Sequence, residues 1–191
     1  MDPRSQRDYI VALADDDPAR RVEAARALYH WGCLAVEPAL KTWRSDAELA
    51  ALLGQALTVG IAVRPDTFER IHKAWGQPRL SSVPPEHEVA EFEIHAAEGV
   101  HLDILTPQPP ESTAPLGRFL ARHGEAIQQV EVPVLDVERA AALLKERFGL
   151  DPIYAAPRTG ANGTRVNFVL VTVGEGRMLV ELVQPPDPTN S

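Results

Sequence analysis

Two segments of the chain show the same alternation of apolar positions, and each is followed by an amphipathic helical pattern. Residues 57–63 and 126–134 alternate with a period of two, which predicts a strand in each case. Residues 66–75 and 135–148 then repeat apolar positions with helical spacing, and a glycine ends each pattern, at Gly76 and Gly149. The chain therefore contains a strand followed by a helix twice.

The similarity continues beyond the two predicted helices. Residues 89–94 match 165–170 in their alternation, and residues 102–107 match 180–185. This pattern predicts an internal repeat, with one βαβββ unit at 56–107 and a second at 126–185. The expected fold class is α+β, with eight strands in a domain that spans residues 54–185 and a short tail at 186–191.

The segment before this domain has a different composition. Residues 1–53 are rich in Ala, Leu, Arg and Glu, and their spacing predicts four short helices, at 5–14, 18–31, 33–44 and 46–53. Residues 15–28 and 35–40 together resemble one HEAT repeat, so we expect a small all-helical HEAT-like domain. A single repeat cannot bury its own apolar face. The helical domain is therefore expected either to cap the strand-containing domain or to bind a protein partner.

Composition and charge exclude several classes of protein. The formal net charge of −8 argues against sequence-independent nucleic-acid binding, which needs a basic surface. No apolar run approaches the roughly 20 residues of a membrane span, and the first residues lack a signal-peptide pattern. Cys33 is the one cysteine, so no intrachain disulfide can form. We expect a cytoplasmic protein that has no nucleic-acid or membrane partner.

Polar residues interrupt the apolar alternation on several predicted strands. Side chains two positions apart lie on the same face of a strand. If both units form one curved sheet, six polar side chains are expected to project into a common cup: Thr58, Glu91, Asp103, Gln129, Asn167 and Glu181. Three of them are carboxylates, and like charges in apolar surroundings cannot all remain ionised. At least one should bind a proton or meet a cation.

Several segments resemble one known superfamily in their order along the chain. Residues 59–63, 85–91, 112–127, 160–168 and 178–184 are similar to segments of the vicinal oxygen chelate superfamily, which includes glyoxalases and bleomycin-resistance proteins. The resemblance is closest to the methylmalonyl-CoA epimerase family and covers residues 55–185. It implies paired βαβββ units, a small carboxylate or acyl-thioester substrate, and an isomerase that acts by proton abstraction. Members of this superfamily often pair, so the resemblance also allows a homodimer.

The resemblance assigns roles to individual residues. The catalytic base of the family falls on Glu91, and its partner acid falls on Glu181. The metal-binding positions of the family fall on Thr58, Asp103, Gln129 and Glu181. Both histidines of the family's site are thus replaced, by a threonine and a glutamine, so the metal site is degenerate and would hold a divalent ion weakly. His95 and His101 fall outside these positions. His95 shares a face with Glu91, so it either enters the cup or, like His101, lies at a strand end in solvent.

A glycine loop supplies the remaining candidates for ligand binding. Asn167 and four residues in or beside the loop are the candidates for ligand binding: Arg158, Gly160, Gly163 and Arg165. The two arginines are the candidates for binding a phosphate of a coenzyme A-like ligand. The alternative for the glycine loop is a plain turn between strands. Three functions stay open at this point. The protein is an epimerase-like isomerase or lyase with an altered metal site, a non-catalytic module that sequesters a small molecule, or a scaffold. Metal titration combined with ligand-induced shifts in melting temperature separates the first two.

Overall fold

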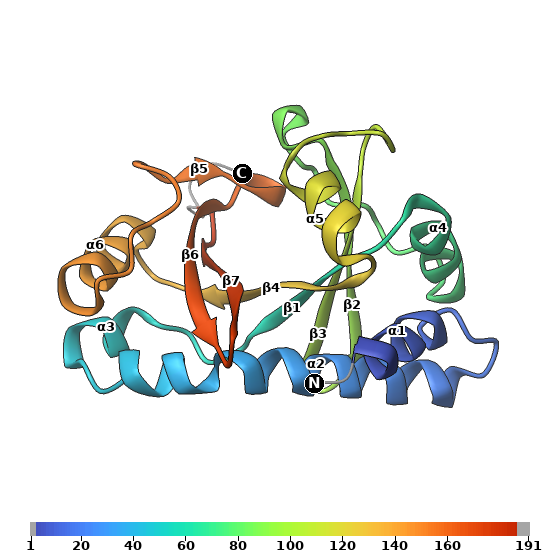
Figure 1. The fold of residues 1–191 in the computed structure, drawn as a ribbon, viewed down its shortest axis with the longest axis horizontal. Helices are drawn as coiled ribbons and strands as arrows, with labels where there is room; N and C mark the ends of the chain where they lie inside the picture. The colour runs from blue at the N-terminus through green and yellow to red at the C-terminus, as the bar shows by residue number, and fades with distance from the viewer. Residues whose placement is uncertain (1–2, 187–191) are drawn as a thin grey trace. The chain divides into compact units, whose positions relative to one another are not determined.

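The computed structural model describes residues 3–186, which divide into two compact units (Figure 1). The first unit contains the chain up to Gly32 together with Thr58–Gln128. The second contains Cys33–Leu57 and the chain from Gln129 onward. The predicted helical segment 1–53 therefore contributes residues to both units. All but the first residue of the tail expected at 186–191 lies outside the described part of the chain.

Three helices form the N-terminal segment: α1 (Pro3–Ala12), α2 (Pro18–Trp43) and α3 (Ala47–Leu52). The two helices predicted at 18–31 and 33–44 are one continuous helix of 26 residues, so the helix pair of a HEAT repeat is not formed. Gly32 lies inside this helix and does not end it. The absence of a side chain at Gly32 allows α2 to pack closely on a neighbouring strand. A Cβ atom at Gly32 would lie 2.6 Å from Cγ2 of Val59, a strand residue. No helix within residues 3–186 is both long and apolar enough to cross a membrane.

The first unit holds three strands in the order β2-β3-β1. Its elements are β1 (Thr58–Ala62), α4 (Pro65–Ala74), the 3-10 turn η1 (Pro85–His87), β2 (Val89–Ala97), β3 (Val100–Pro107) and α5 (Pro115–His123). β1 is parallel to β3, and β2 is antiparallel to it. Only two strands follow α4 among the described residues of this unit, so the predicted βαβββ pattern is βαββ here. Three prolines between α4 and β2 explain the difference, because proline cannot donate to a sheet ladder.

The two faces of the first sheet differ in their packing. One face carries buried apolar residues, including Val59, Ile61 and Phe92. Phe68 of α4 packs edge-on against Phe92, with ring centroids 4.8 Å apart. The opposite face is apolar only at one end, where Leu105 joins a buried cluster with Ala62 and two leucines of α5. The rest of that face is polar, and it bears the candidate chemistry.

The second unit holds four strands in the order β4-β7-β6-β5. Its elements after the N-terminal segment are β4 (Ala126–Pro133) from Gln129 onward, α6 (Val137–Phe148), β5 (Arg158–Thr159), the short turn η2 (Ala161–Gly163), β6 (Arg165–Val173) and β7 (Gly176–Gln184). β4 is parallel to β7, which is antiparallel to β6. The predicted strand–helix pair is confirmed. The Asp136 carboxylate accepts a hydrogen bond from the Arg139 backbone at the start of α6, and Gly149 ends the helix in the left-handed conformation.

The core of the second unit lies between the sheet and α6. Val130, Val132 and Val134 are buried, as predicted for the helix-facing side of β4. Leu143 and Leu144 of α6 are fully buried as well. Arg165 of β6 forms an ion pair with Glu138 of α6 at 2.7 Å. The helix α6 therefore lies on the same face of the sheet as the Arg165 side chain. Gln129 and Glu131 alternate with the valines and therefore lie on the other face.

Candidate functional site

In the first unit, the predicted acidic residues share one face of the sheet. Asp103 of β3 lies opposite Gly60 of β1 and Glu93 of β2, while Glu91 lies opposite Leu105. Thr58 is two residues from Gly60 on β1, so it has the same orientation. The predicted common face for Thr58, Glu91 and Asp103 is therefore confirmed within this unit.

Glu91 is a buried acid of this face, and its pKa is strongly raised. Only 8% of its surface is exposed, because it lies beside Leu105 and the apolar cluster under α5. Burial raises the pKa of Glu91 to about 8, and the neighbouring Asp103 carboxylate acts in the same direction. A hydrogen bond from the Ser81 side chain opposes this change. Glu91 therefore gains and loses a proton near neutral pH, which suits a general acid or base.

In the second unit, Gln129 and Glu181 form a direct contact. Gln129 Nε2 donates a hydrogen bond to Glu181 Oε2, and it lies 3.3 Å from Glu131 Oε1. Glu131 of β4 and Glu181 of β7 lie opposite each other in the parallel ladder. The amide nitrogen thus satisfies carboxylate oxygens on one face of the sheet. The predicted shared face for Gln129 and Glu181 is confirmed within this unit.

Asn167 lies on the other face, which corrects its predicted position in the cup. Its ladder partner is Leu182, whereas Phe168 is the partner of Glu181. The Asn167 side chain is buried and holds the backbone of Tyr154: Oδ1 accepts from the Tyr154 nitrogen at 3.1 Å, and Nδ2 donates to the Tyr154 oxygen at 3.0 Å. Asn167 therefore anchors the loop that follows α6.

The residues of the predicted glycine loop have local partners. The Arg158 guanidinium stacks on the ring of Tyr154, 3.8 Å from its centroid, and Arg165 pairs with Glu138. Gly163 has a φ of +78°, which favours glycine, and a Cβ at Gly160 would clash with Thr164 and Val166. These contacts account for the two glycines as turn residues. Ligand binding by the loop stays a prediction.

Sequence reasoning missed one cluster on the β2–β3 hairpin. Glu93, His95 and His101 each place a possible ligand atom within 4.8 Å of the others. Solvent at a strand end was the expected position of His101 and one of the two positions expected for His95. His95 is largely exposed, with 63% of its side chain accessible, but only 25% of the His101 side chain is accessible. The signal that could have found the cluster is the hairpin register, which places His95 directly opposite His101.

The four positions at which the superfamily resemblance implies metal ligands do not fit a borderline metal ion such as zinc. Thr58 supplies a hydroxyl and Gln129 an amide, where imidazole nitrogens would be required. Gln129 also turns its amide nitrogen, which cannot ligate a cation, towards Glu181.

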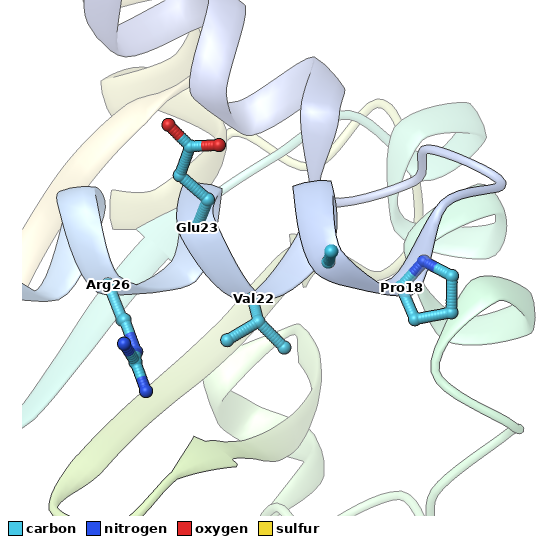
Figure 2. Close-up of a pocket in the computed structure, with 5 residues that line it drawn as sticks. Pro18, Val22, Glu23 and Arg26 are labelled. Atoms are coloured by element: carbon cyan, nitrogen blue, oxygen red, sulfur yellow. The ribbon is translucent and has the colours of Figure 1, made fainter.

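A separate hollow lies on α2, shown in Figure 2. Its lining residues all come from the first turns of this helix: Pro18, Ala19, Val22, Glu23 and Arg26. The Arg26 and Val22 side chains point the same way, whereas Glu23 points away from them. The hollow contains one carboxylate, from Glu23, and one guanidinium, from Arg26, on an exposed helix surface. It therefore offers no arrangement for catalysis.

Solved structures with this fold include methylmalonyl-CoA epimerases. The enzyme from Mycobacterium tuberculosis is 24% identical, with a TM-score of 0.56, over 72% of this chain and 89% of that chain. A variant of the enzyme from Streptomyces coelicolor, in complex with 2-nitronate-propionyl-CoA, is 25% identical, with a TM-score of 0.56, over 71% and 99% of the two chains. A hypothetical protein from Bacillus halodurans is 21% identical, with a TM-score of 0.57, over 72% and 100%.

No model of a known protein family matches the chain, and no curated protein matches it. The structural similarity supports the α+β fold predicted from the repeat.

Proposed function

We propose that this chain, which shares its fold with methylmalonyl-CoA epimerases, acts as an isomerase that removes a proton from the carbon next to a thioester. The observation that supports this proposal is the raised pKa of the Glu91 carboxyl group. Burial and Asp103 raise the pKa of Glu91 to about 8, so a working fraction of the carboxylate is ionised near neutral pH. A base with such a pKa is also strong enough to take up a proton from carbon.

In the proposed step, the Glu91 carboxylate takes the proton from the carbon. The carbon–hydrogen bond breaks, its electron pair enters the enolate of the thioester, and a bond between oxygen and hydrogen forms on Glu91. The apolar cluster around Leu105 excludes water from one side of this carboxylate. Return of a proton to the other face of the carbon would invert its configuration. The role of partner acid for Glu181 stays a prediction.

Solvent-deuterium exchange into a methylmalonyl-type thioester tests the proposal. We expect the purified chain to incorporate deuterium at the acidic carbon, and Glu91→Gln to lose exchange by at least about 100-fold, the usual effect of removing a general base. Glu98→Gln is the matched control, because Glu98 lies in the exposed turn of the same hairpin. Unchanged exchange in Glu91→Gln would remove Glu91 from the mechanism.

One observation favours a second candidate function, which is ligand binding without turnover. Both imidazoles expected at the family's metal positions are replaced, and Gln129 and Glu181 satisfy each other instead. A non-catalytic module would raise its melting temperature on binding the thioester but show no deuterium exchange. The two measurements on one preparation therefore distinguish the candidates.

A further inference from the structure

The cluster on the β2–β3 hairpin combines two imidazoles with one carboxylate. His95 Nε2 lies 3.2 Å from Glu93 Oε2, and His101 Nδ1 lies 3.3 Å from Glu93 Oε1. The two rings stand nearly perpendicular to each other, with centroids 4.6 Å apart. Glu93 is therefore held between two ring nitrogens, one on its own strand and one on the next.

The sheet ladder places these three side chains together. His95 and His101 are direct partners across the antiparallel pair, and Glu93 precedes His95 by two residues, so all three lie on one face. The register shifts between His95 and Ala97, next to the cluster. A local irregularity of this kind re-aims the side chains beside it.

We propose that Glu93, His95 and His101 bind a divalent transition-metal ion of the zinc type. Such ions prefer two or more imidazole nitrogens with a carboxylate, at about 2.0–2.2 Å from the metal. Two ligand atoms at that distance on a tetrahedral ion are about 3.4 Å apart, close to the 3.2 Å and 3.3 Å separations here. Small movements of the side chains would therefore admit an ion in place of the imidazole–carboxylate contacts.

Solvent has access to the cluster, so water can complete the coordination shell. The exposed fractions of the side chains are 63% for His95, 42% for Glu93 and 25% for His101. Three protein ligands with an open position are the usual arrangement of sites that exchange a water for another ligand. The site also shares its sheet face with Glu91, Asp103 and Thr58.

This site is not the one that the superfamily resemblance implies. Those positions include Thr58 and Gln129, neither of which supplies an imidazole. The proposed site lies entirely within the first unit and uses residues of two neighbouring strands. It goes beyond the proposed function, because metal binding at the hairpin is measured without any substrate.

Titration of the untagged full chain with Zn²⁺ and with Co²⁺, after removal of metals by EDTA, tests the proposal. We expect one equivalent of either ion to bind and Co²⁺ to develop visible absorption bands. The double variant His95→Ala/His101→Ala should lose at least about tenfold in affinity, and Glu93→Gln should weaken binding as well. The matched control is His30→Ala/His123→Ala, which also removes two exposed imidazoles and should bind within about twofold of the wild type.

Two results would overturn the proposal: no binding of Zn²⁺ to the wild type, or equal affinity in His95→Ala/His101→Ala. Melting temperatures measured in EDTA show whether each variant is folded, and Glu93→Gln supplies a second test if the double variant is not. Glu91→Gln should bind the ion normally even though it loses deuterium exchange. Failure of the metal site and failure of the proposed catalysis are therefore separate outcomes.

Discussion

Gly32 of α2 packs directly on Val59 of β1, at a distance that leaves no room for a side chain. A Cβ atom at Gly32 would lie 2.6 Å and 2.7 Å from the two methyl carbons of Val59. Val59 is fully buried, and its branched side chain has little rotational freedom. We therefore expect Gly32→Ala to lower the free energy of unfolding by about 1–3 kcal/mol through overpacking. Urea unfolding followed by circular dichroism measures this change.

A second substitution tests whether the Val59 contact is the cause. In the background of Val59→Ala, the two methyl groups that obstruct the new Cβ are absent. Gly32→Ala should then be neutral or stabilising by up to about 1 kcal/mol, because alanine favours a helix more than glycine does. An equal loss of stability in both backgrounds would show that the crowding arises elsewhere.

Glu91 should make stability depend on pH in an unusual direction. Its pKa is about 8 in the folded chain against an ordinary value of 4.5, so the folded state holds more protons than the unfolded state between these values. Stability from this group is complete below pH 4.5 and falls as pH rises towards 8, by up to about 1.4 kcal/mol per pH unit. Glu91→Gln keeps a neutral side chain and should remove this slope.

Thermal unfolding in EDTA from pH 4 to pH 9 measures the effect. We expect Glu91→Gln to match the wild type near pH 4 and to exceed its melting temperature above pH 8. Glu98→Gln, in the exposed turn, should follow the wild-type curve throughout. Parallel curves for Glu91→Gln and the wild type would mean that Glu91 does not titrate abnormally.

The local sequence pattern was sufficient to predict most strands and helices, but it did not predict the helices of the N-terminal segment correctly. Alternation located β1 and β4, and glycine located the ends of α4 and α6, because each signal acts within a few residues. The sequence around Gly32 looks like a helix boundary in the same way. Only the contact with Val59, 27 positions further along the chain, explains why glycine lies within a continuous helix.

The pairing register between neighbouring strands explains why Asn167 and the histidine pair were not placed correctly from the sequence. Asp103 and Glu91 were assigned correctly to one face because both alternate with clearly apolar neighbours. Asn167 was assigned to the wrong face because a shift of one residue between β6 and β7 exchanges the two faces. The pairing of His95 with His101 likewise depends on the hairpin register, which the sequence alone does not determine.

Trp75, which directly follows α4, should tie this helix to the residue after α1 through one hydrogen bond. Trp75 Nε1 donates to the Leu13 carbonyl oxygen at 2.9 Å, and the Arg21 guanidinium lies over the same indole ring. Trp75→Phe keeps an aromatic ring but leaves the Leu13 carbonyl without this donor. We expect a loss of about 1 kcal/mol in the free energy of unfolding. Amide exchange should accelerate in α1 but not in α6, and equal acceleration in both helices would contradict a local role for Trp75.

Asn167 should determine the order of the loop between α6 and β5. The side chain has an exposed fraction of 2%, and it supplies both a donor and an acceptor to the Tyr154 backbone. Asn167→Ala removes both bonds and leaves two backbone groups unsatisfied, so we expect a loss of about 1–3 kcal/mol. Tyr154 also contacts the Phe168 ring and the Arg158 guanidinium, and these contacts should loosen together.

Limited proteolysis with trypsin reports directly on that loop, because Arg158 is an exposed cleavage site at its end. We expect cleavage after Arg158 to be several times faster in Asn167→Ala than in the wild type, since local opening controls access of the protease. Thr172→Ala, at an exposed position of the same strand, is the matched control and should leave the rate unchanged. If both variants are cleaved at the wild-type rate, the loop is held by contacts other than Asn167, and its order depends on the packing of Tyr154 instead.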